Sequence, residues 1–168
     1  MTPADLLTDA LGRVLEDVEA VLDGLDEAAL TYRPGPEANP IGWLVWHLTR
    51  VQDDHVADVA GTEQVWVGQR FAERFDLPFD VREHGYGHTS EQVAAVRTPA
   101  GLLLEYHRAT HARTLEYVAS VQPDDLDRVV DTRWDPPVTL GVRLVSVVND
   151  CTQHVGQAAY VRGLVASR

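Results

Sequence analysis

One apolar stripe near the end of the chain carries two polar residues that an ordinary core-facing helix would not hold. The members of the stripe lie three or four residues apart, at helical spacing: Leu144, Val147, Cys151, His154, Ala158, Val161 and Val165. Asp150 falls on the same stripe, three residues after Val147. A carboxylate without a partner in a protein core costs several kcal/mol, so Asp150 needs one. A bound cation would satisfy Asp150 and His154 together, and the stripe therefore predicts a metal site.

A second apolar stripe, earlier in the chain, carries another histidine. Asn39 and Pro40 are typical of an N-cap and a first helical position, so we expect a helix over residues 40–59, before Gly61. His47 falls on its apolar face, together with Leu44, Leu48 and Val51. His47 is thus a third candidate ligand.

The metal site competes with plainer interpretations of the same residues. For His47 alone, a hydrogen-bonded core histidine is an equally good interpretation. Asp150 and His154 stand one above the other on a helix, four residues apart, and can reach a common ion. The alternative for that pair is a buried ion pair without a metal. The three residues together favour the metal site.

The rest of the chain has the pattern of an all-α bundle of four long helices, up-and-down-like in its arrangement. Thr2, Pro3 and Asp5 form a capping pattern before a first helix, whose apolar residues follow in steps of four and three. Thr98 and Pro99 repeat the capping signal before a third long helix. A fourth helix is expected over residues 139–165, with Thr139 as its cap.

Two connections interrupt this pattern. Residues 62–98 have poor periodicity and form a long insertion between the second and third long helices, with a short helix starting at Thr89 or Ser90. Residues 123–137 form a second crossing between the third and fourth helices. We expect three hydrophobic residues to anchor it: Val129, Val130 and Trp134.

Composition narrows the class of protein. A length of 168 residues suits a single domain over residues 1–168. The net charge is −12, from 14 basic and 26 acidic side chains, which argues against nucleic acid as a partner. There is no signal-peptide pattern at the start, no apolar run near the roughly 18 residues of a membrane span, and only one cysteine. We therefore expect a cytoplasmic protein without a membrane partner.

The motif around the three candidate ligands resembles the DinB-like (damage-inducible) superfamily of metal-binding four-helix bundles. In that superfamily, one histidine on the second helix joins an H-x-x-x-H pair followed by G-Q on the fourth. His47 and His154 match the first and last histidines, and Gly156-Gln157 and Arg162 continue the pattern. Asp150 replaces the middle histidine, which is similar to the branch containing the mycothiol-dependent maleylpyruvate isomerases. Residues 83–90 also look like that branch, and the resemblance covers nearly the whole chain.

The resemblance implies an enzyme that uses a divalent metal and a low-molecular-weight thiol such as mycothiol, in S-transfer to a small electrophile or its isomerisation. Zinc is expected, while the ligand types suit nickel, manganese or iron as well. Two alternatives stay open: a metal-dependent hydrolase that activates water, and a non-catalytic metal-binding stress-response protein. The oligomeric state is also open, with a homodimer as one alternative.

Several other residues are candidates for parts of such a site. His55 and Asp54, two turns beyond His47, are the candidates for a general base. Arg33 and Arg162 could hold an anionic group of a thiol cofactor or serve the structure alone.

The remaining histidines and the cysteine have simpler interpretations. His107 and His111 have the spacing of a ligand pair, but their charged neighbours favour a solvated helix face. His84 and His88, in a glycine-bearing loop, could reach the mouth of a pocket, but we expect ordinary exposed histidines. Cys151 has no evident activating base and is expected to be a small buried residue rather than a nucleophile.

Overall fold

Four long helices form the body of the protein, as the sequence predicts: α1 (Pro3–Leu22), α3 (Ile41–Ala60), α7 (Ala100–Val118) and α8 (Leu140–Ala166). The computed structural model describes residues 1–166, so the last two residues of the predicted 1–168 domain lie outside the described residues. Each long helix packs against two others, in the cyclic order α1, α7, α3, α8. None of the helices in the described part of the chain has the length and apolarity needed to cross a membrane.

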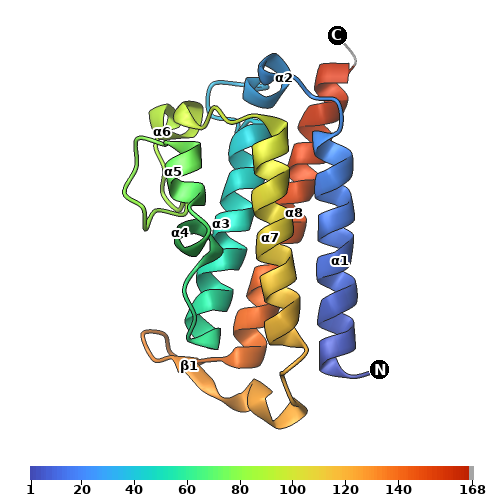
Figure 1. Ribbon diagram of the computed structural model, residues 1–168, viewed down its shortest axis with the longest axis vertical. Helices are drawn as coiled ribbons and strands as arrows, with labels where there is room; N and C mark the ends of the chain where they lie inside the picture. Colours follow the sequence, from blue (N-terminus) through green and yellow to red (C-terminus); the bar gives the residue numbers. More distant parts are fainter. Residues whose placement is uncertain (167–168) are drawn as a thin grey trace.

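The long insertion lets α3 and α7, which follow one another among the long helices, run in the same direction. In Figure 1, α1 and α8 run upward and α3 and α7 run downward, so α3 is antiparallel to α8 and parallel to α7. Residues 61–99 therefore return from one end of the bundle to the other. This is the long crossover connection found in some four-helix bundles.

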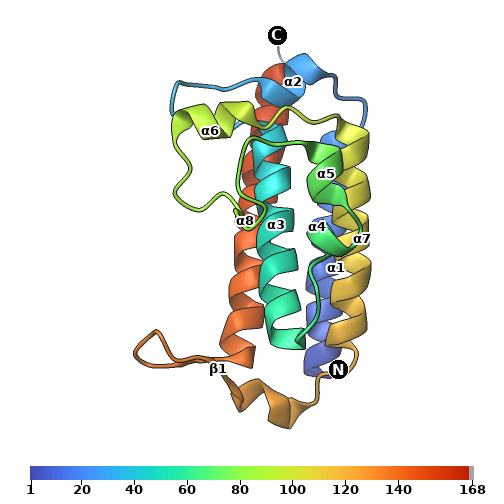
Figure 2. The same cartoon turned by 60° about the vertical axis from the view of Figure 1, so that its left-hand side comes forward.

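The smaller elements lie in the connections. They are α2 (Glu27–Thr31), α4 (Val65–Gly68), α5 (Phe71–Phe75), α6 (Ser90–Ala95), the 3₁₀ helix η1 (Pro123–Asp127), and the strands β1 (Val129–Asp131) and β2 (Val138–Thr139). The expected short helix is α6, and Thr89 caps it in a capping box with Gln92. β1 and β2 pair antiparallel, with Val129 opposite Thr139. Figure 2 shows the connection between the strands projecting beside the lower end of α8.

Helix capping follows the sequence at α1 but not at α3 or α7. Thr2 and Asp5 form the predicted capping box of α1. The predicted caps Asn39 and Thr98 are wrong, because each helix begins one residue later than expected. The extended residue before each helix is a proline, Pro40 or Pro99, and neither cap has a side-chain hydrogen bond.

A buried polar centre attaches the insertion to α3. The Asp53 carboxylate accepts hydrogen bonds from the backbone N–H groups of Val65 and Trp66, at 2.9 and 2.8 Å, and from the Tyr106 hydroxyl at 2.8 Å. The Arg50 guanidinium, which is fully buried, lies 5.0 Å from the centre of the Trp66 ring. These contacts satisfy two buried charges and fix α4 against the bundle.

The second crossing is held by charge rather than by its hydrophobic residues. The prediction that Val129 and Trp134 anchor it is wrong, because they are 51% and 66% exposed, while Val130 is only half-buried. Asp131 is the buried residue, and its carboxylate accepts hydrogen bonds from Arg143 at 3.0 Å and Arg133 at 2.8 Å. Two guanidinium groups stabilise the carboxylate, so the strand is tied to α8 by an ion pair.

The prediction of a solvated face for His107 and His111 is also wrong. Both side chains are buried, and His107 is completely so. His107 Nδ1 lies 3.0 Å from the Thr49 hydroxyl of α3. The charged neighbours misled the prediction because adjacent residues on a helix point in different directions, and Arg108 reaches outward to Glu19 of α1.

The burial of His107 predicts a pH-dependent stability. Burial lowers the pKa of His107 to about 3, against about 6.5 in an unfolded chain. The unfolded state therefore binds the proton first, and the free energy of unfolding falls as the pH drops from about 6.5 towards 3. This residue alone should remove about 2 kcal/mol between pH 7.5 and pH 5. Denaturant unfolding of the parent and of His107→Gln at both pH values measures the difference, and parallel pH profiles would contradict it.

Candidate metal centre

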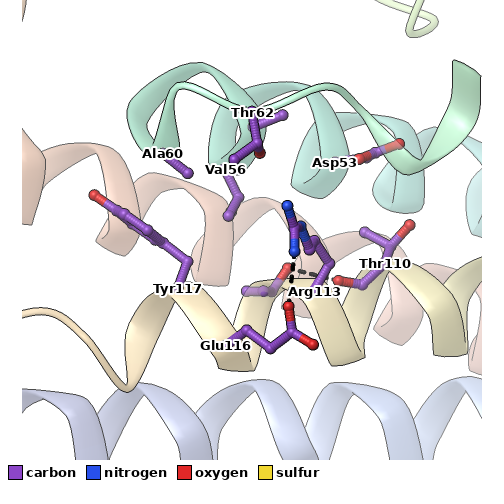
Figure 3. A pocket seen from close by; sticks show the side chains of 10 residues that line it. Asp53, Val56, Ala60, Thr62, Thr110, Arg113, Glu116 and Tyr117 are labelled. Carbon is purple, nitrogen blue, oxygen red and sulfur yellow. Dashed lines mark hydrogen bonds and ion pairs between the residues drawn. The ribbon is translucent and has the colours of Figure 1, made fainter. Parts of the chain in front are cut away.

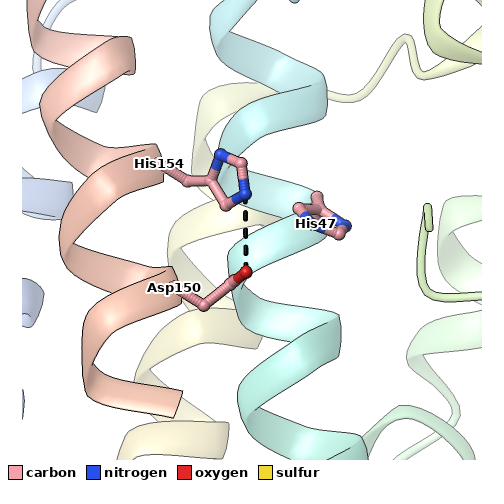
Figure 4. Close-up of side chains that lie close together, drawn as sticks. All are labelled: His47, Asp150 and His154. Carbon is pink, nitrogen blue, oxygen red and sulfur yellow. Dashed lines mark ion pairs between the residues drawn. The ribbon is translucent and has the colours of Figure 1, made fainter. Parts of the chain in front are cut away.

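The packing of α3 against α8 brings the three candidate ligands together. His47 comes from the first half of α3, and Asp150 and His154 come from successive turns of α8. One ligand atom from each residue lies within 4.8 Å of the other two (Figure 4). His154 Nε2 and Asp150 Oδ1 are 3.6 Å apart, close to the roughly 3.4 Å separating two ligands that lie about 2.1 Å from a tetrahedral ion.

The cluster lies at the edge of the core rather than inside it. His47 is buried, but the side chains of Asp150 and His154 are 31% and 19% exposed. The expectation that the α8 stripe is buried throughout is therefore only partly right. Asp150 Oδ2 is nevertheless shielded from solvent and has no hydrogen-bond partner among the described residues. An orphaned carboxylate oxygen beside two imidazoles fits a cation.

The charges of the cluster suit metal ligation. Burial and, to a smaller extent, the nearby His154 lower the pKa of His47 to about 4. His47 is therefore neutral at pH 7 and keeps a lone pair for a metal. The Asp150 carboxylate raises the pKa of His154, as expected for an imidazole beside a negative charge.

A backbone carbonyl orients the His47 ring. His47 Nδ1 lies 2.5 Å from the carbonyl oxygen of His84, in the loop before α6. A carbonyl only accepts hydrogen bonds, so Nδ1 must carry the hydrogen and Nε2 must carry the lone pair. A partner of this kind on the nitrogen remote from the metal is typical of histidine ligands.

Gly85 allows this loop to approach His47. Its φ is +100°, in the region that favours glycine, and a Cβ there would lie 2.6 Å from His47 Nδ1 and 3.1 Å from both Trp43 and Trp46. No other residue fits without moving the loop. The loop and its carbonyl were not foreseen, because backbone contacts leave little trace in a single sequence.

The ring of His154 is oriented in the same way by its own helix. His154 Nδ1 lies 3.0 Å from Gln157 Oε1, three residues further along α8. With Nδ1 donating to this oxygen, Nε2, which faces Asp150, is the nitrogen that a metal would occupy. The contact of Gln157 with the site was not predicted, although the spacing of three residues was visible in the sequence.

Trp43, which sequence reasoning did not single out, forms a wall of the cluster. Its ring stacks on His47 with centroids 4.6 Å apart and an angle of 10° between the planes, and it meets His154 edge-on at 6.3 Å. Trp43 Nε1–H donates to His88 Nδ1 at 3.3 Å, and His88 Nε2 lies 2.9 Å from a Glu83 carboxylate oxygen. The expectation of exposed histidines is wrong, since the His88 side chain is 2% exposed and His84 is half-buried.

His55 and Asp54 lie further along α3 and do not join the three ligands. His55 Nδ1 is 2.6 Å from Arg143 Nη1, so the ring accepts a hydrogen bond from a guanidinium. Asp54 Oδ1 accepts a hydrogen bond from Gln64 Nε2 at 2.7 Å. Burial lowers the pKa of His55, and the charge of Arg143 lowers it further, so His55 is neutral at pH 7.

The two arginines have structural partners. Arg33 Nε donates to the Ala38 carbonyl at 2.6 Å, and its Nη1 reaches Ser90 at the start of α6. Arg162 Nη1 donates to the carbonyls of Ala20 and Val21 in the last turn of α1, where a positive charge is favoured.

Cys151 is buried, as expected. Burial raises the pKa of its thiol, which lies 3.6 Å from the Leu48 carbonyl oxygen and 3.8 Å from Gln52 Oε1. A neutral thiol held in the core is a poor nucleophile.

A separate cavity of about 200 Å³ lies between α3 and α7 (Figure 3). Arg113 extends across it and pairs with Glu116 at 2.9 Å. None of the three candidate ligands lines this cavity, and α8 contributes no residue to it. The candidate metal centre is therefore separate from this cavity.

The chain is similar to known proteins in its sequence and in its fold. A model of the mycothiol-S-transferase family matches residues 6–167. The crystal structure of a conserved protein from Enterococcus faecalis is similar over 100% of this chain and 99% of that chain, with 32% sequence identity and a TM-score of 0.93. A search of curated proteins found no match.

The close approach of Gly85 predicts a specific effect of adding a methyl group. Gly85→Ala should displace the His84 carbonyl from His47 and weaken zinc binding by about 10-fold or more, as loss of such partners usually does. Gly87→Ala is the matched control, because Gly87 also has a positive φ, +74°, but a Cβ added there would meet no atom within 4 Å. Zinc titration of both variants checks this, and equal losses would show that backbone strain alone is responsible.

Proposed function

The chain belongs to the mycothiol-S-transferase family, and from this membership we propose that it is a divalent-metal-dependent enzyme that transfers a mycothiol-like thiol to a small electrophile. The observation that carries the proposal is the convergence of His47, Asp150 and His154, with each imidazole held by a partner on its Nδ1. Ligands oriented in advance are expected of a site that binds a metal.

The three residues would hold the ion, and each has a defined part. His47 and His154 offer the lone pairs on Nε2, and Asp150 offers a carboxylate oxygen whose charge offsets part of the charge of the ion. When bound, a divalent ion supplies Lewis acidity that lowers the pKa of a thiol and makes a nucleophile available at neutral pH. Three protein ligands suit a catalytic rather than a structural zinc site.

The surrounding residues keep this site rigid and partly dry. Trp43 covers one face of the His47 ring, and the Gly85 backbone covers its Nδ1 edge. The exposed fractions of Asp150 and His154 leave the α8 side of the cluster accessible to a small molecule. We propose zinc as the ion, and two imidazoles with one carboxylate also suit nickel, manganese or iron.

The hydrolase alternative is less well supported by the neighbouring residues. Activation of water would need a general base close to the cluster. The Nδ1 lone pair of His55 accepts a hydrogen bond from Arg143, and Asp54 is bound to Gln64. Thiol chemistry needs no such base once the thiol is deprotonated, so we favour the transferase.

A purely structural metal is also less well supported. The helices already share a continuous hydrophobic core that includes Leu44, Leu48, Val147 and Val155 on the two helices that carry the ligands. Burial of this apolar surface stabilises the bundle without an ion. The metal is therefore available for chemistry.

Removal of the metal should separate these alternatives. We expect a chelator to abolish thiol consumption with a small alkyl halide while the helical circular dichroism signal stays nearly unchanged. Added zinc should restore activity. Collapse of the helical signal on chelation would instead assign the metal to stability.

Replacement of Asp150 tests the ligand set itself. Asp150→Ala should lower metal affinity by about 10-fold or more, because a direct ligand matters at least as much as its supporting partners. Asp150→His should retain the metal, because imidazole can ligate from the same helical position. Asn149→Ala, at the exposed neighbouring position, is the control. Unchanged affinity in Asp150→Ala would remove Asp150 from the site.

A further inference from the structure

A second polar cluster lies on the same α3–α8 seam as the candidate ligands. Arg143 precedes Asp150 by seven residues on α8, and His55 follows His47 by eight residues on α3. Because the two helices are antiparallel, both displacements lead towards the same end of the bundle. The two residues meet there, with Arg143 Nη1 2.6 Å from His55 Nδ1.

This contact fixes the tautomer of His55. A guanidinium has donors and no acceptor, so Nδ1 of His55 must carry the lone pair. In a neutral imidazole the hydrogen then lies on Nε2. Arg143 is itself held by Asp131, at 3.0 Å from its Nη2, which keeps the guanidinium in place. His55 is therefore a preset hydrogen-bond donor.

The donor is free and accessible. The side chain of His55 is 34% exposed, whereas those of Arg143 and Asp131 are 10% and 5% exposed. His55 Nε2 has no hydrogen-bond partner among residues 1–166. An N–H group that the protein orients but leaves unpaired is suited to an acceptor on a ligand.

The charges around His55 select the kind of acceptor. Asp54 Oδ2 lies 3.8 Å from the ring, and Asp150 also acts electrostatically on it, so a carboxylate would be repelled. A cation offers no acceptor for the Nε2–H group. A neutral oxygen, in a hydroxyl or an amide, can accept the hydrogen bond and is not repelled by the carboxylates.

The distance between the two clusters suggests which molecule carries this oxygen. Eight residues of helix span about 12 Å, so the His55 ring lies roughly that far along the seam from His47. A small alkyl electrophile is too short to reach both. A low-molecular-weight thiol with a polar extension of sugar size is long enough.

We infer that His55 Nε2–H, set by Arg143 and Asp131, binds a hydroxyl or amide oxygen at the far end of the thiol whose sulfur lies at the His47–Asp150–His154 cluster. This inference rests on the proposed function and adds to it a means of selecting the thiol. A thiol without the polar extension would make no contact with His55.

Calorimetric titration of thiols into zinc-loaded protein tests the inference. Mycothiol carries amide and hydroxyl oxygens beyond its thiol, and ethanethiol carries none. His55→Leu should weaken mycothiol binding by about 5-fold, the value of one neutral hydrogen bond, and leave ethanethiol and zinc affinities unchanged. His55→Gln, which can place an N–H near the position of Nε2, should restore mycothiol binding.

Equal mycothiol affinity in the parent and His55→Leu, or equal losses for both thiols, would overturn the inference and leave the proposed function intact. Failure of the zinc-loaded parent to bind either thiol would overturn both. Nitrogen-15 NMR of the metal-free protein gives a readout independent of thiols: we expect His55 to be protonated on Nε2 and not on Nδ1. The opposite tautomer would overturn the inference by itself.

Discussion

The antiparallel packing of α3 against α8 is the constraint on which the rest of the structure depends. It places residues that are about a hundred positions apart in the sequence at one point on the bundle surface. Each helix supplies apolar residues to the shared core and polar residues to the edge of the same seam. Burial of the apolar residues drives the packing, and the packing then fixes the spacing of the polar ones. The candidate metal centre is a consequence of how the two helices meet.

The crossover insertion supports this arrangement from outside the bundle. The buried Arg50 donates to the backbone carbonyls of Glu83 and Val81, at 3.2 and 3.4 Å, and so holds the loop that contains His84 and Gly85. That loop in turn orients His47. A charge buried in the core is costly unless it is fully hydrogen-bonded. Here the hydrogen bonds of Arg50 hold the loop whose backbone carbonyl lies beside a candidate ligand. The buried charge therefore contributes to the geometry of the candidate metal centre.

Much of this could be predicted from the sequence, and the failures have physical causes. Helical periodicity predicted the four long helices, and polar residues on apolar stripes predicted which three side chains converge. The periodicity could not show which face of α7 is buried where polar and apolar residues mix, so His107 was misplaced. Nor could it show contacts made by backbone atoms, such as the His84 carbonyl. Gln157 was visible at the right spacing, but its partner became clear only once the orientation of His154 was known.

We propose that the α3–α8 seam presents Nε2 of His47, Nε2 of His154 and a carboxylate oxygen of Asp150 to one divalent ion. Anomalous X-ray diffraction at the zinc edge, from crystals of untagged protein supplied with zinc, tests it most directly. We expect one strong peak about 2.0–2.3 Å from all three atoms, with a position left open for a thiol. A peak elsewhere, or no peak between the two helices, would contradict it.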